Sequence, residues 1–302
     1  MTDGSPGLAP AGPGRIDAHV HLWQLSVRDQ PWTAGLPLLR RDFTLDDLRP
    51  QLAAAGMRAA VLVQTVPVAA ETPEMLALAD SANEIAGVVG WVDLRAADVA
   101  ARLAALMEGP GGGWLAGIRH GVQDEHDPDW LLWPEVLRGL QAVADAGLVY
   151  DLLVRSDQLL MAAHAARRQP GLRFVLDHAG KPPIASGAID PWRLHVDELA
   201  CCPNVAVKLS GLLTEAGPGV DATTLRPYSD HLLGAFGPGR MMFGSDWPVS
   251  SLRAGYARVA SLTAELLGGL SGEERDSVFG ATAAAWYGFG AAGHGHARRP
   301  CG

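Results

Sequence analysis

Two histidines separated by one residue are the first side chains in this chain whose type and spacing point to chemistry. His19 and His21 end the apolar, β-type run that starts at Arg15. Residues two apart on a strand point to the same face, so both imidazoles should enter the same space. Imidazole is a common ligand of divalent metals. A hydrogen-bonded pair in the core is the alternative, but at the end of a first strand we favour a metal site.

A carboxylate near the other end of the chain is predicted to complete this site. Asp246 lies in the turn Gly-Ser-Asp-Trp-Pro, directly after the apolar run Met241–Phe243. A carboxylate at a strand end can bind a metal and can also accept a proton from attacking water. The alternative is a helix N-cap. Pro248 and the absence of a helical pattern directly after it disfavour that interpretation.

One further histidine and two lysines follow later strands. His178, after the run Phe174–Asp177, is predicted to be a third ligand, a general acid or a donor to a substrate oxygen. The chain has 24 basic residues, and only Lys181 and Lys208 are lysines. Because arginine is used elsewhere, we expect these two positions to need a compact ammonium, for an oxyanion, a substrate hydroxyl or an internal carboxylate.

The remaining predicted substrate-binding residues are an arginine, a histidine and three aromatic residues near strand ends. Arginine has a planar fork that suits a substrate carboxylate. Tryptophan at a pocket wall can stack against a sugar ring, although packing at the rim is the competing interpretation. These residues are Trp23, Arg119, His120, Tyr150 and Trp247.

Short apolar runs alternate with helical segments along the whole chain, and this alternation predicts an α/β fold. The expected strands are residues 15–21, 59–64, 87–92, 115–121, 147–154, 173–180, 204–211 and 241–248. Eight strand–helix units predict a single-domain (β/α)8 TIM barrel with an extra C-terminal helix ending near Tyr287. An open doubly wound sheet is the alternative, but no glycine-rich phosphate turn follows the first strand. In a barrel all the polar strand ends open on one mouth.

The composition of the chain restricts the classes of partner that it can bind, and the sequence pattern sets the expected limits of the domain. The 302 residues carry a net charge of −9, which argues against a nucleic-acid binder. No apolar stretch approaches the ~20 residues of a membrane span. The three cysteines, Cys201, Cys202 and Cys301, give no disulfide framework, so a cytoplasmic location is expected. We expect one barrel over residues 15–290, a disordered lead over 1–14 and a disordered tail over 291–302. A homo-oligomer is compatible with the many helix faces of a barrel.

Five segments together resemble the amidohydrolase superfamily, and in particular its sugar-lactonase branch, whose members include L-fuconolactonases and L-rhamnonolactonases. They run in barrel order from residue 16 to about 289. They are Ile16-Asp17-Ala18-His19-Val20-His21-Leu22-Trp23, Gly117-Ile118-Arg119-His120, Leu176-Asp177-His178-Ala179-Gly180-Lys181-Pro182-Pro183, Val207-Lys208-Leu209-Ser210-Gly211 and Met242-Phe243-Gly244-Ser245-Asp246-Trp247-Pro248-Val249.

The resemblance implies a barrel that opens sugar-acid lactones, with or without a divalent metal. His19 and His21 match the metal motif of strand 1, His178 the histidine of strand 6, and Asp246 the aspartate of strand 8. Superfamily members with two metals carry a lysine or glutamate on strand 4 and a histidine on strand 5. Here strand 4 offers Arg119 and His120, and strand 5 offers Tyr150 and Asp151. We therefore expect one metal, zinc or manganese, held weakly or not at all.

The expected reaction is water attack on a lactone carbonyl, with Asp246 as general base. A metal, or Arg119, His178 and Lys208 as direct donors, would polarise the carbonyl. Three alternatives remain open: a dicarboxylate pyrone lactonase, a barrel decarboxylase and a non-catalytic barrel. The first would need several arginines at the mouth, and only Arg119, Arg155 and Arg253 are placed to serve.

Overall fold

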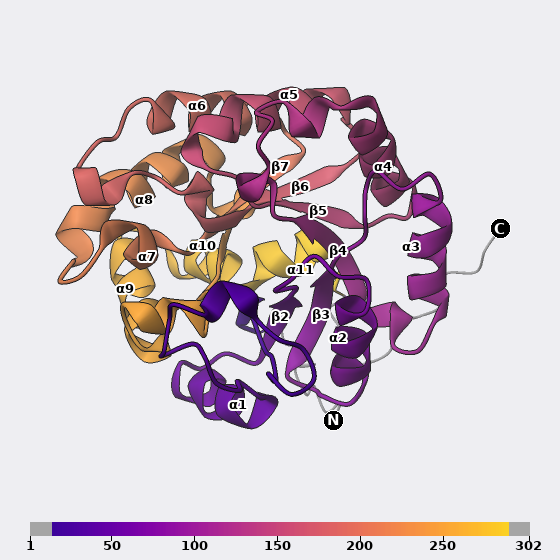
Figure 1. The fold of residues 1–302 in the computed structure, drawn as a ribbon. Helices are drawn as coiled ribbons and strands as arrows, with labels where there is room; N and C mark the ends of the chain where they lie inside the picture. The colour runs from indigo at the N-terminus through magenta and orange to yellow at the C-terminus, as the bar shows by residue number, and fades with distance from the viewer. Residues whose placement is uncertain (1–13, 290–302) are drawn as a thin grey trace, which may run out of the picture.

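Eight parallel strands form one sheet in the order β1 to β8 in this computed structural model, which describes residues 14–289 (Figure 1). The first and last strands meet through a bridge between Val20 and Trp247 and a hydrogen bond from His21 N to Trp247 O of 2.8 Å. The sheet is therefore a nearly closed barrel, and the predicted (β/α)8 fold is confirmed. The strands are Ile16–Val20 (β1), Ala59–Val63 (β2), Ile85–Gly90 (β3), Leu115–His120 (β4), Val149–Leu152 (β5), Arg173–Leu176 (β6), Val205–Leu209 (β7) and Met241–Phe243 (β8).

Helices surround the strands, as Figure 1 shows in a view onto the carboxyl ends of the strands. They are Leu45–Ala54 (α1), Glu71–Asp80 (α2), Val99–Glu108 (α3), Pro134–Asp145 (α4), Leu159–Arg168 (α5), Trp192–Ala200 (α6), Leu212–Ala216 (α7), Ala222–Phe236 (α8), Tyr256–Leu266 (α9), Gly272–Asp276 (α10) and Thr282–Tyr287 (α11). The short helix α7 was not predicted, because the five residues between two glycine-containing turns are too few to show a periodic pattern.

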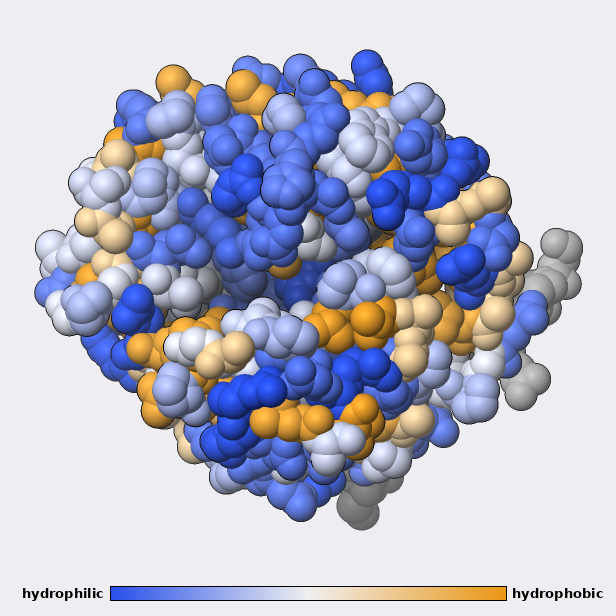
Figure 2. Space-filling model, viewed as in Figure 1, coloured by the Kyte–Doolittle hydropathy of each residue, from blue (hydrophilic) through white to orange (hydrophobic). Residues whose placement is uncertain are grey.

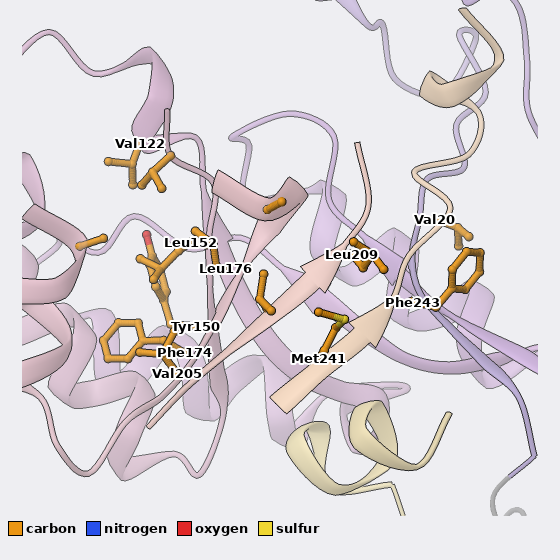
Figure 3. Packing of buried hydrophobic residues seen from close by; sticks show 14 of the residues in the cluster. Val20, Val122, Tyr150, Leu152, Phe174, Leu176, Val205, Leu209, Met241 and Phe243 are labelled. Atoms are coloured by element: carbon orange, nitrogen blue, oxygen red, sulfur yellow. The ribbon is translucent and has the colours of Figure 1, made fainter. Parts of the chain in front are cut away.

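Two separate hydrophobic cores hold the barrel. The larger one lies between the sheet and the helices, and Figure 3 shows part of it around Tyr150 and Phe174, whose ring centroids are 6.0 Å apart. The smaller core fills the barrel itself and includes Val61 and Met242. Tyr287 of α11 belongs to this inner core, so the C-terminal helix packs against the inner side chains of the strands.

The strands end earlier at the mouth than predicted. β6 stops at Leu176 and β8 at Phe243, whereas the expected strands ran to Gly180 and Pro248. After β6 the backbone turns sharply, because His178 and Ala179 adopt positive φ angles of 51° and 54°. The polar residues at these positions are therefore held by turns rather than by extended strands.

The predicted C-terminal helix is present but interrupted. α10 and α11 are separated by a wide turn at Ser277–Ala281, in which Gly280 leaves helical geometry. A Cβ at Gly280 would lie 2.2 Å from the carbonyl oxygen of Gly14, so only glycine fits there. No helix among the described residues is long and apolar enough to cross a membrane. Except for Gly14, the predicted N-terminal lead and the C-terminal tail lie outside the described residues.

Candidate active site

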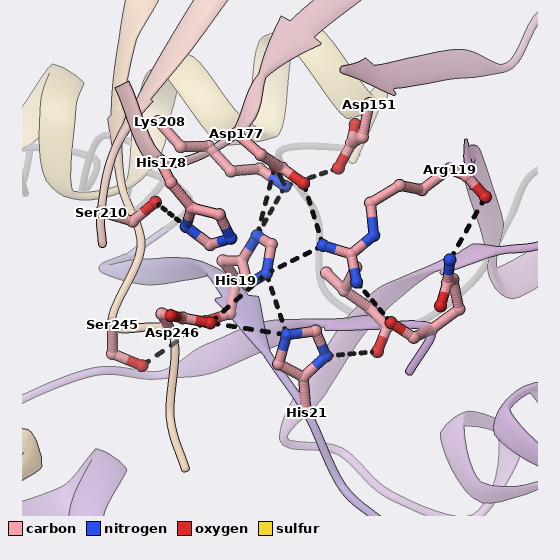
Figure 4. A network of polar contacts seen from close by, with 12 residues as sticks. His19, His21, Arg119, Asp151, Asp177, His178, Lys208, Ser210, Ser245 and Asp246 are labelled. Carbon is pink, nitrogen blue, oxygen red and sulfur yellow. Dashed lines mark hydrogen bonds and ion pairs between the residues drawn. The ribbon is translucent and has the colours of Figure 1, made fainter. Parts of the chain in front are cut away.

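The two histidines at the end of β1 both face the inside of the barrel. Their Nε2 atoms are 3.1 Å apart (Figure 4). The pairing of β1 with β2 shifts register between Asp17 and Val20, and such irregularities re-aim side chains. His21 Nδ1 lies 2.8 Å from the carbonyl oxygen of Val63. Since a carbonyl only accepts, Nδ1 carries a proton, and Nε2 of His21 faces the site.

Asp246, which follows the neighbouring strand β8, and His178, which follows β6, complete the cluster. Asp246 Oδ1 lies 3.5 Å from His21 Nε2 and 3.8 Å from His19 Nε2. The His178 ring centroid lies 4.6 Å from that of His19, and its Nδ1 is 3.0 Å from Ser210 Oγ. The sequence prediction that these four residues converge therefore agrees with the structure.

Asp246 and His178 both have left-handed backbone conformations, with φ angles of 56° and 51°. For a residue other than glycine this geometry costs about 1–2 kcal/mol. Such strain persists only where the surrounding structure enforces it, and it is concentrated at functional sites. The fold therefore accepts a cost at two positions in order to turn these two side chains into the barrel.

The arrangement fits a divalent metal ion. His19, His178 and Asp246 each offer one ligand atom, and these atoms lie within 4.8 Å of one another. Two imidazole nitrogens on one ion, at 2.0–2.1 Å each, are separated by about 2.9–3.4 Å. The separation of 3.1 Å between His19 Nε2 and His21 Nε2 falls in that range. Imidazole and carboxylate ligands suit zinc or manganese.

A fully buried charge network lies beneath the histidines. Lys208 Nζ is 2.5 Å from Asp151 Oδ2, 2.9 Å from Asp177 Oδ1 and 3.1 Å from His19 Nδ1. Tyr287 of α11 donates from its hydroxyl to Asp151 at 2.9 Å. Of the partners expected for Lys208, the structure shows internal carboxylates and not a substrate, because the residue is completely buried and its ammonium lies between Asp151 and Asp177, beside His19. It supports His19 from inside the barrel. The scarcity of lysine was the signal that identified it.

Arg119 joins the same network and is 4% exposed. It donates from Nη1 to Asp177 Oδ2 at 3.0 Å and from Nη2 to the carbonyl oxygen of Gln64 at 2.5 Å. Its Nη1 is also 3.4 Å from His19 Nε2, and its Nε has no hydrogen-bond partner among the described residues. The guanidinium thus borders the histidine cluster, where it adds a fixed positive charge.

Two predicted site residues lie on the other side of the sheet. Neighbouring strand residues point to opposite faces, and Arg119 and Asp151 take the inner positions. His120 lies outside among Trp91, Trp130 and Glu125: Trp91 donates to its Nδ1 at 3.0 Å, and its Nε2 is 2.7 Å from Glu125. Tyr150 is fully buried in the outer core. The structure therefore does not bring His120 or Tyr150 together with the histidine cluster.

Trp23 and Trp247 pack near the mouth instead of standing free in it. Each is 5% exposed, and both rings meet Phe43 edge-on, with centroid distances of 5.0 and 5.4 Å. Trp23 also donates to the carbonyl oxygen of Arg41 at 2.7 Å. Trp23 and Phe43 line a cavity of about 540 Å³ between the starts of α1 and α2, and none of the histidines lines it.

At the mouth itself, charged residues from two loops approach the cluster. Figure 2 shows a hollow at the centre of this face with hydrophilic residues at its floor. Lys181 is partly exposed and follows the turn that carries His178. Glu215 of α7 is half-buried, and its charge interacts with those of Lys181 and Asp246. Sequence reasoning missed Glu215, because no motif distinguishes it from any other helical glutamate.

Burial and neighbouring charges set the ionisation of the cluster. Burial lowers the pKa of His178 to about 4, so this ring is neutral at pH 7. Burial also lowers the pKa of His19 well below its usual value, with Lys208 adding to the effect. Burial alone would raise the pKa of Asp246, but the three histidines outweigh it and hold the pKa below the usual range. The site therefore presents an ionised carboxylate beside neutral imidazoles, as a metal site or a general base requires.

Comparisons with known proteins agree with this architecture. The amidohydrolase family model matches residues 16–289. The L-fucono-1,5-lactonase of Burkholderia ambifaria is 44% identical over 239 residues, covering 79% of this chain and 81% of its own length. The L-fucono-1,5-lactonase of Burkholderia multivorans is 41% identical over 286 residues, covering 90% of this chain and 95% of its own.

A solved structure extends the likeness to three dimensions. The crystal structure of an amidohydrolase from Burkholderia multivorans with bound zinc has a TM-score of 0.86 and 42% identity. The alignment covers 91% of this chain and 99% of that one. A homologous structure thus holds a metal, and this chain has a His/His/Asp cluster able to bind one. By its fold, its ordered motifs and these matches, the chain belongs to the amidohydrolase family.

Proposed function

We propose that this protein hydrolyses the lactone of a sugar acid. The observation that carries the proposal is the inward-facing cluster of His19, His21, His178 and Asp246, with its ionised carboxylate and neutral imidazoles. The relatives named L-fucono-1,5-lactonase, at 41% and 44% identity, support a sugar lactone as the substrate class.

In the proposed reaction Asp246 accepts a proton from a water molecule whose oxygen attacks the lactone carbonyl carbon. The tetrahedral oxyanion lies against His178 and the positive charge of Arg119, which stabilise it. The bond between the carbonyl carbon and the ring oxygen then breaks. Asp246 returns its proton to the ring oxygen, which leaves as a hydroxyl, and the product is an open hydroxy acid.

His178 has two neutral tautomers, and each suits a different form of the site, one without a metal and one with a metal. Its partner Ser210 Oγ, at 3.0 Å, can either donate to Nδ1 or accept from it. When Ser210 donates, Nε2–H of His178 is a hydrogen-bond donor for the oxyanion. When Ser210 accepts, the Nε2 lone pair is free for a metal held with His19, His21 and Asp246. A bound zinc or manganese would supply Lewis-acid polarisation of the carbonyl.

The arrangement of arginines does not favour a dicarboxylate substrate. Arg119 is ion-paired with Asp177 at 3.0 Å, and Arg155 is paired with Asp157 at 3.1 Å. Of the three candidate arginines only the exposed Arg253 has no ion pair among the described residues, whereas a dicarboxylate needs several free guanidinium groups. We therefore propose an uncharged lactone in place of a pyrone dicarboxylate.

The test is a panel of aldonolactones assayed with a pH indicator, with chelator-treated enzyme and with added zinc or manganese. We expect at least one lactone to open well above its spontaneous rate. Asp246→Asn should lower kcat/KM by about 10²-fold or more, because the variant cannot accept the proton. Metal content of the protein purified without chelator would show whether the cluster holds an ion.

A matched control is Asp276→Asn, at an exposed position on α10. It should keep full activity, and both variants should give the circular dichroism spectrum of the parent. Full activity in Asp246→Asn would overturn the assignment of the base. No lactone opened under any metal condition would overturn the proposed function, and release of carbon dioxide from a carboxylated aromatic substrate would favour the decarboxylase alternative.

A further inference from the structure

We propose that Glu215 determines substrate specificity, by accepting hydrogen bonds from the hydroxyl groups of an uncharged lactone and by repelling substrates that carry a carboxylate. This inference rests on the proposed function and deepens it, since it names the feature of the substrate that the mouth recognises. Three properties of Glu215 carry the argument: its position, its missing partner and the charges around it.

Its position places it in the same space as the base. α7 begins directly after Ser210 and Gly211, and Ser210 is the hydrogen-bond partner of His178. A Cβ on Gly211 would lie 2.7 Å from His178 Cβ, so the start of α7 is packed tightly against that histidine. Glu215 comes one helical turn later, and the charge of its carboxylate interacts with that of Asp246. Its carboxylate is therefore near enough to Asp246 for the two charges to interact, at the edge of the space that a substrate must enter.

Its carboxylate lacks a partner within the protein. No hydrogen bond or ion pair to the Glu215 side chain occurs among the residues that the structure describes, although the residue is half-buried. Other partly buried acidic side chains are paired, as Glu84 is with Arg49 and Glu125 with His120. Burying an unpaired carboxylate is unfavourable, so its retention calls for a ligand that supplies donors. Ionised carboxylates only accept, and vicinal hydroxyls of a sugar are suitable donors.

The charges around it select against anions. Glu215 and Asp246 repel each other, and burial together with this repulsion raises the pKa of Glu215, while Lys181 opposes the rise. A substrate carboxylate placed here would add a third negative charge. Lys181, on the neighbouring loop after β6, can donate to the hydroxyl oxygens that Glu215 does not engage. The pair thus suits a neutral polyol ring, whose hydroxyls both donate and accept.

The experiment measures binding separately from turnover. An aldonolactam, in which the ring oxygen is replaced by NH, and the unhydroxylated δ-valerolactam are titrated calorimetrically into the parent protein, Glu215→Gln and Glu273→Gln. Glu273 is an exposed glutamate on α10 and serves as the matched control. The parent should prefer the hydroxylated lactam. In Glu215→Gln that preference should fall about tenfold, as expected when a hydrogen bond to a charged acceptor becomes one to a neutral amide. The control should keep the parent's preference.

Kinetics give the second readout. For an aldonolactone, Glu215→Gln should raise KM more than it lowers kcat. For a lactone bearing a free carboxylate, kcat/KM relative to that of the aldonolactone should rise about tenfold, because one negative charge is removed. An unchanged lactam preference and an unchanged substrate ratio in Glu215→Gln would overturn the inference. A parent protein that prefers the hydroxylated lactam but opens no lactone would overturn the proposed function and leave this inference standing.

Discussion

At the scale of single residues, the ionisation of His178 and Asp246 governs the reaction. The proposed mechanism needs Asp246 ionised, and His178 must be neutral to serve as a metal ligand. An exposed histidine takes up its proton near pH 6.5, whereas burial lowers the pKa of His178 to about 4. The pKa of Asp246 is held below its usual range. The same protonation states therefore persist from neutral pH down to about pH 4, and they are lost only below it.

This shift predicts an unusual pH profile. For chelator-treated enzyme, kcat/KM corrected for spontaneous hydrolysis should stay level from pH 7 to about pH 5. No acid limb should appear near pH 6.5, because His178 takes up no proton until the pH drops to about 4 and Asp246 stays ionised. The measurement is a stopped assay of lactone consumption across this range. An acid limb centred near 6.5 would contradict the burial argument.

Residue types and spacing in the sequence were sufficient to identify the four central side chains. The two-residue spacing of His19 and His21 predicted that they share a face of the strand. The position of Asp246 in a turn after the last apolar run predicted that it joins the site. Of the predicted residues on β4 and β5, Arg119 borders the cluster, whereas His120 and Tyr150 lie on the outer side of the sheet. Which of two consecutive polar residues faces inward depends on the register of the strand, and that is set by its partners in the sheet.

At the scale of elements, the start of α7 fixes the position of His178. Gly211 has a φ of 69°, and a Cβ there would meet His178. Gly147 also has a positive φ, 73°, but a Cβ on it would meet nothing within 4 Å. Both glycines therefore have a positive φ angle that disfavours other residues. They differ in whether an added Cβ would meet a neighbouring side chain.

These glycines predict a difference between two variants that share the same backbone cost. Gly147→Ala should lose about 1–2 kcal/mol of unfolding free energy, from placing alanine in a left-handed conformation, and Gly211→Ala should lose more, because its Cβ would also collide with His178. Gly211→Ala should in addition lower kcat/KM by about 10²-fold, since displacing a catalytic group by about 1 Å has an effect of that size. Urea unfolding and steady-state kinetics on both variants check this. Equal activities in the two variants would contradict the proposed role of His178.

The elements themselves were largely predictable, because apolar runs and capping residues are local signals. Thr44 precedes α1, and its backbone N–H donates to Asp47 at 2.8 Å, a capping pattern that the sequence Thr-Leu-Asp-Asp contains. The turns after β6 and β8 could not be predicted from the sequence, because most residues other than glycine avoid the positive φ angles that His178 and Asp246 adopt there. They are imposed by contacts with distant parts of the chain, which a local pattern does not contain.

At the scale of the whole molecule, the last helix is tied to the active site through the interior of the barrel. Tyr287 packs in the inner core and donates to both oxygens of Asp151 at 2.9 Å. Asp151 in turn holds Lys208, which contacts His19. A chain of polar contacts thus runs from α11 to the histidine cluster.

Two tyrosine variants test how much this chain of polar contacts contributes to the free energy of unfolding. Tyr287→Phe should lower the unfolding free energy by about 1–3 kcal/mol, because a buried carboxylate loses a donor. Tyr150→Phe should leave stability unchanged or raise it, because the buried Tyr150 hydroxyl has no hydrogen-bond partner among the described residues. Both variants remove one oxygen atom from a fully buried or nearly buried ring. Urea unfolding followed by circular dichroism compares them, and equal losses would contradict this account.

The closure of β8 against β1 has a consequence for how the protein is made and kept folded. His19 and Asp246 come from the first and last strands, so their meeting requires nearly the entire chain to be in place. Contacts between such distant residues carry the largest loop-closure entropy and form late in folding. Catalytic competence should therefore appear only with the final native structure. A ligand that contacts both strands binds only the native state, so its binding stabilises the folded barrel against unfolding.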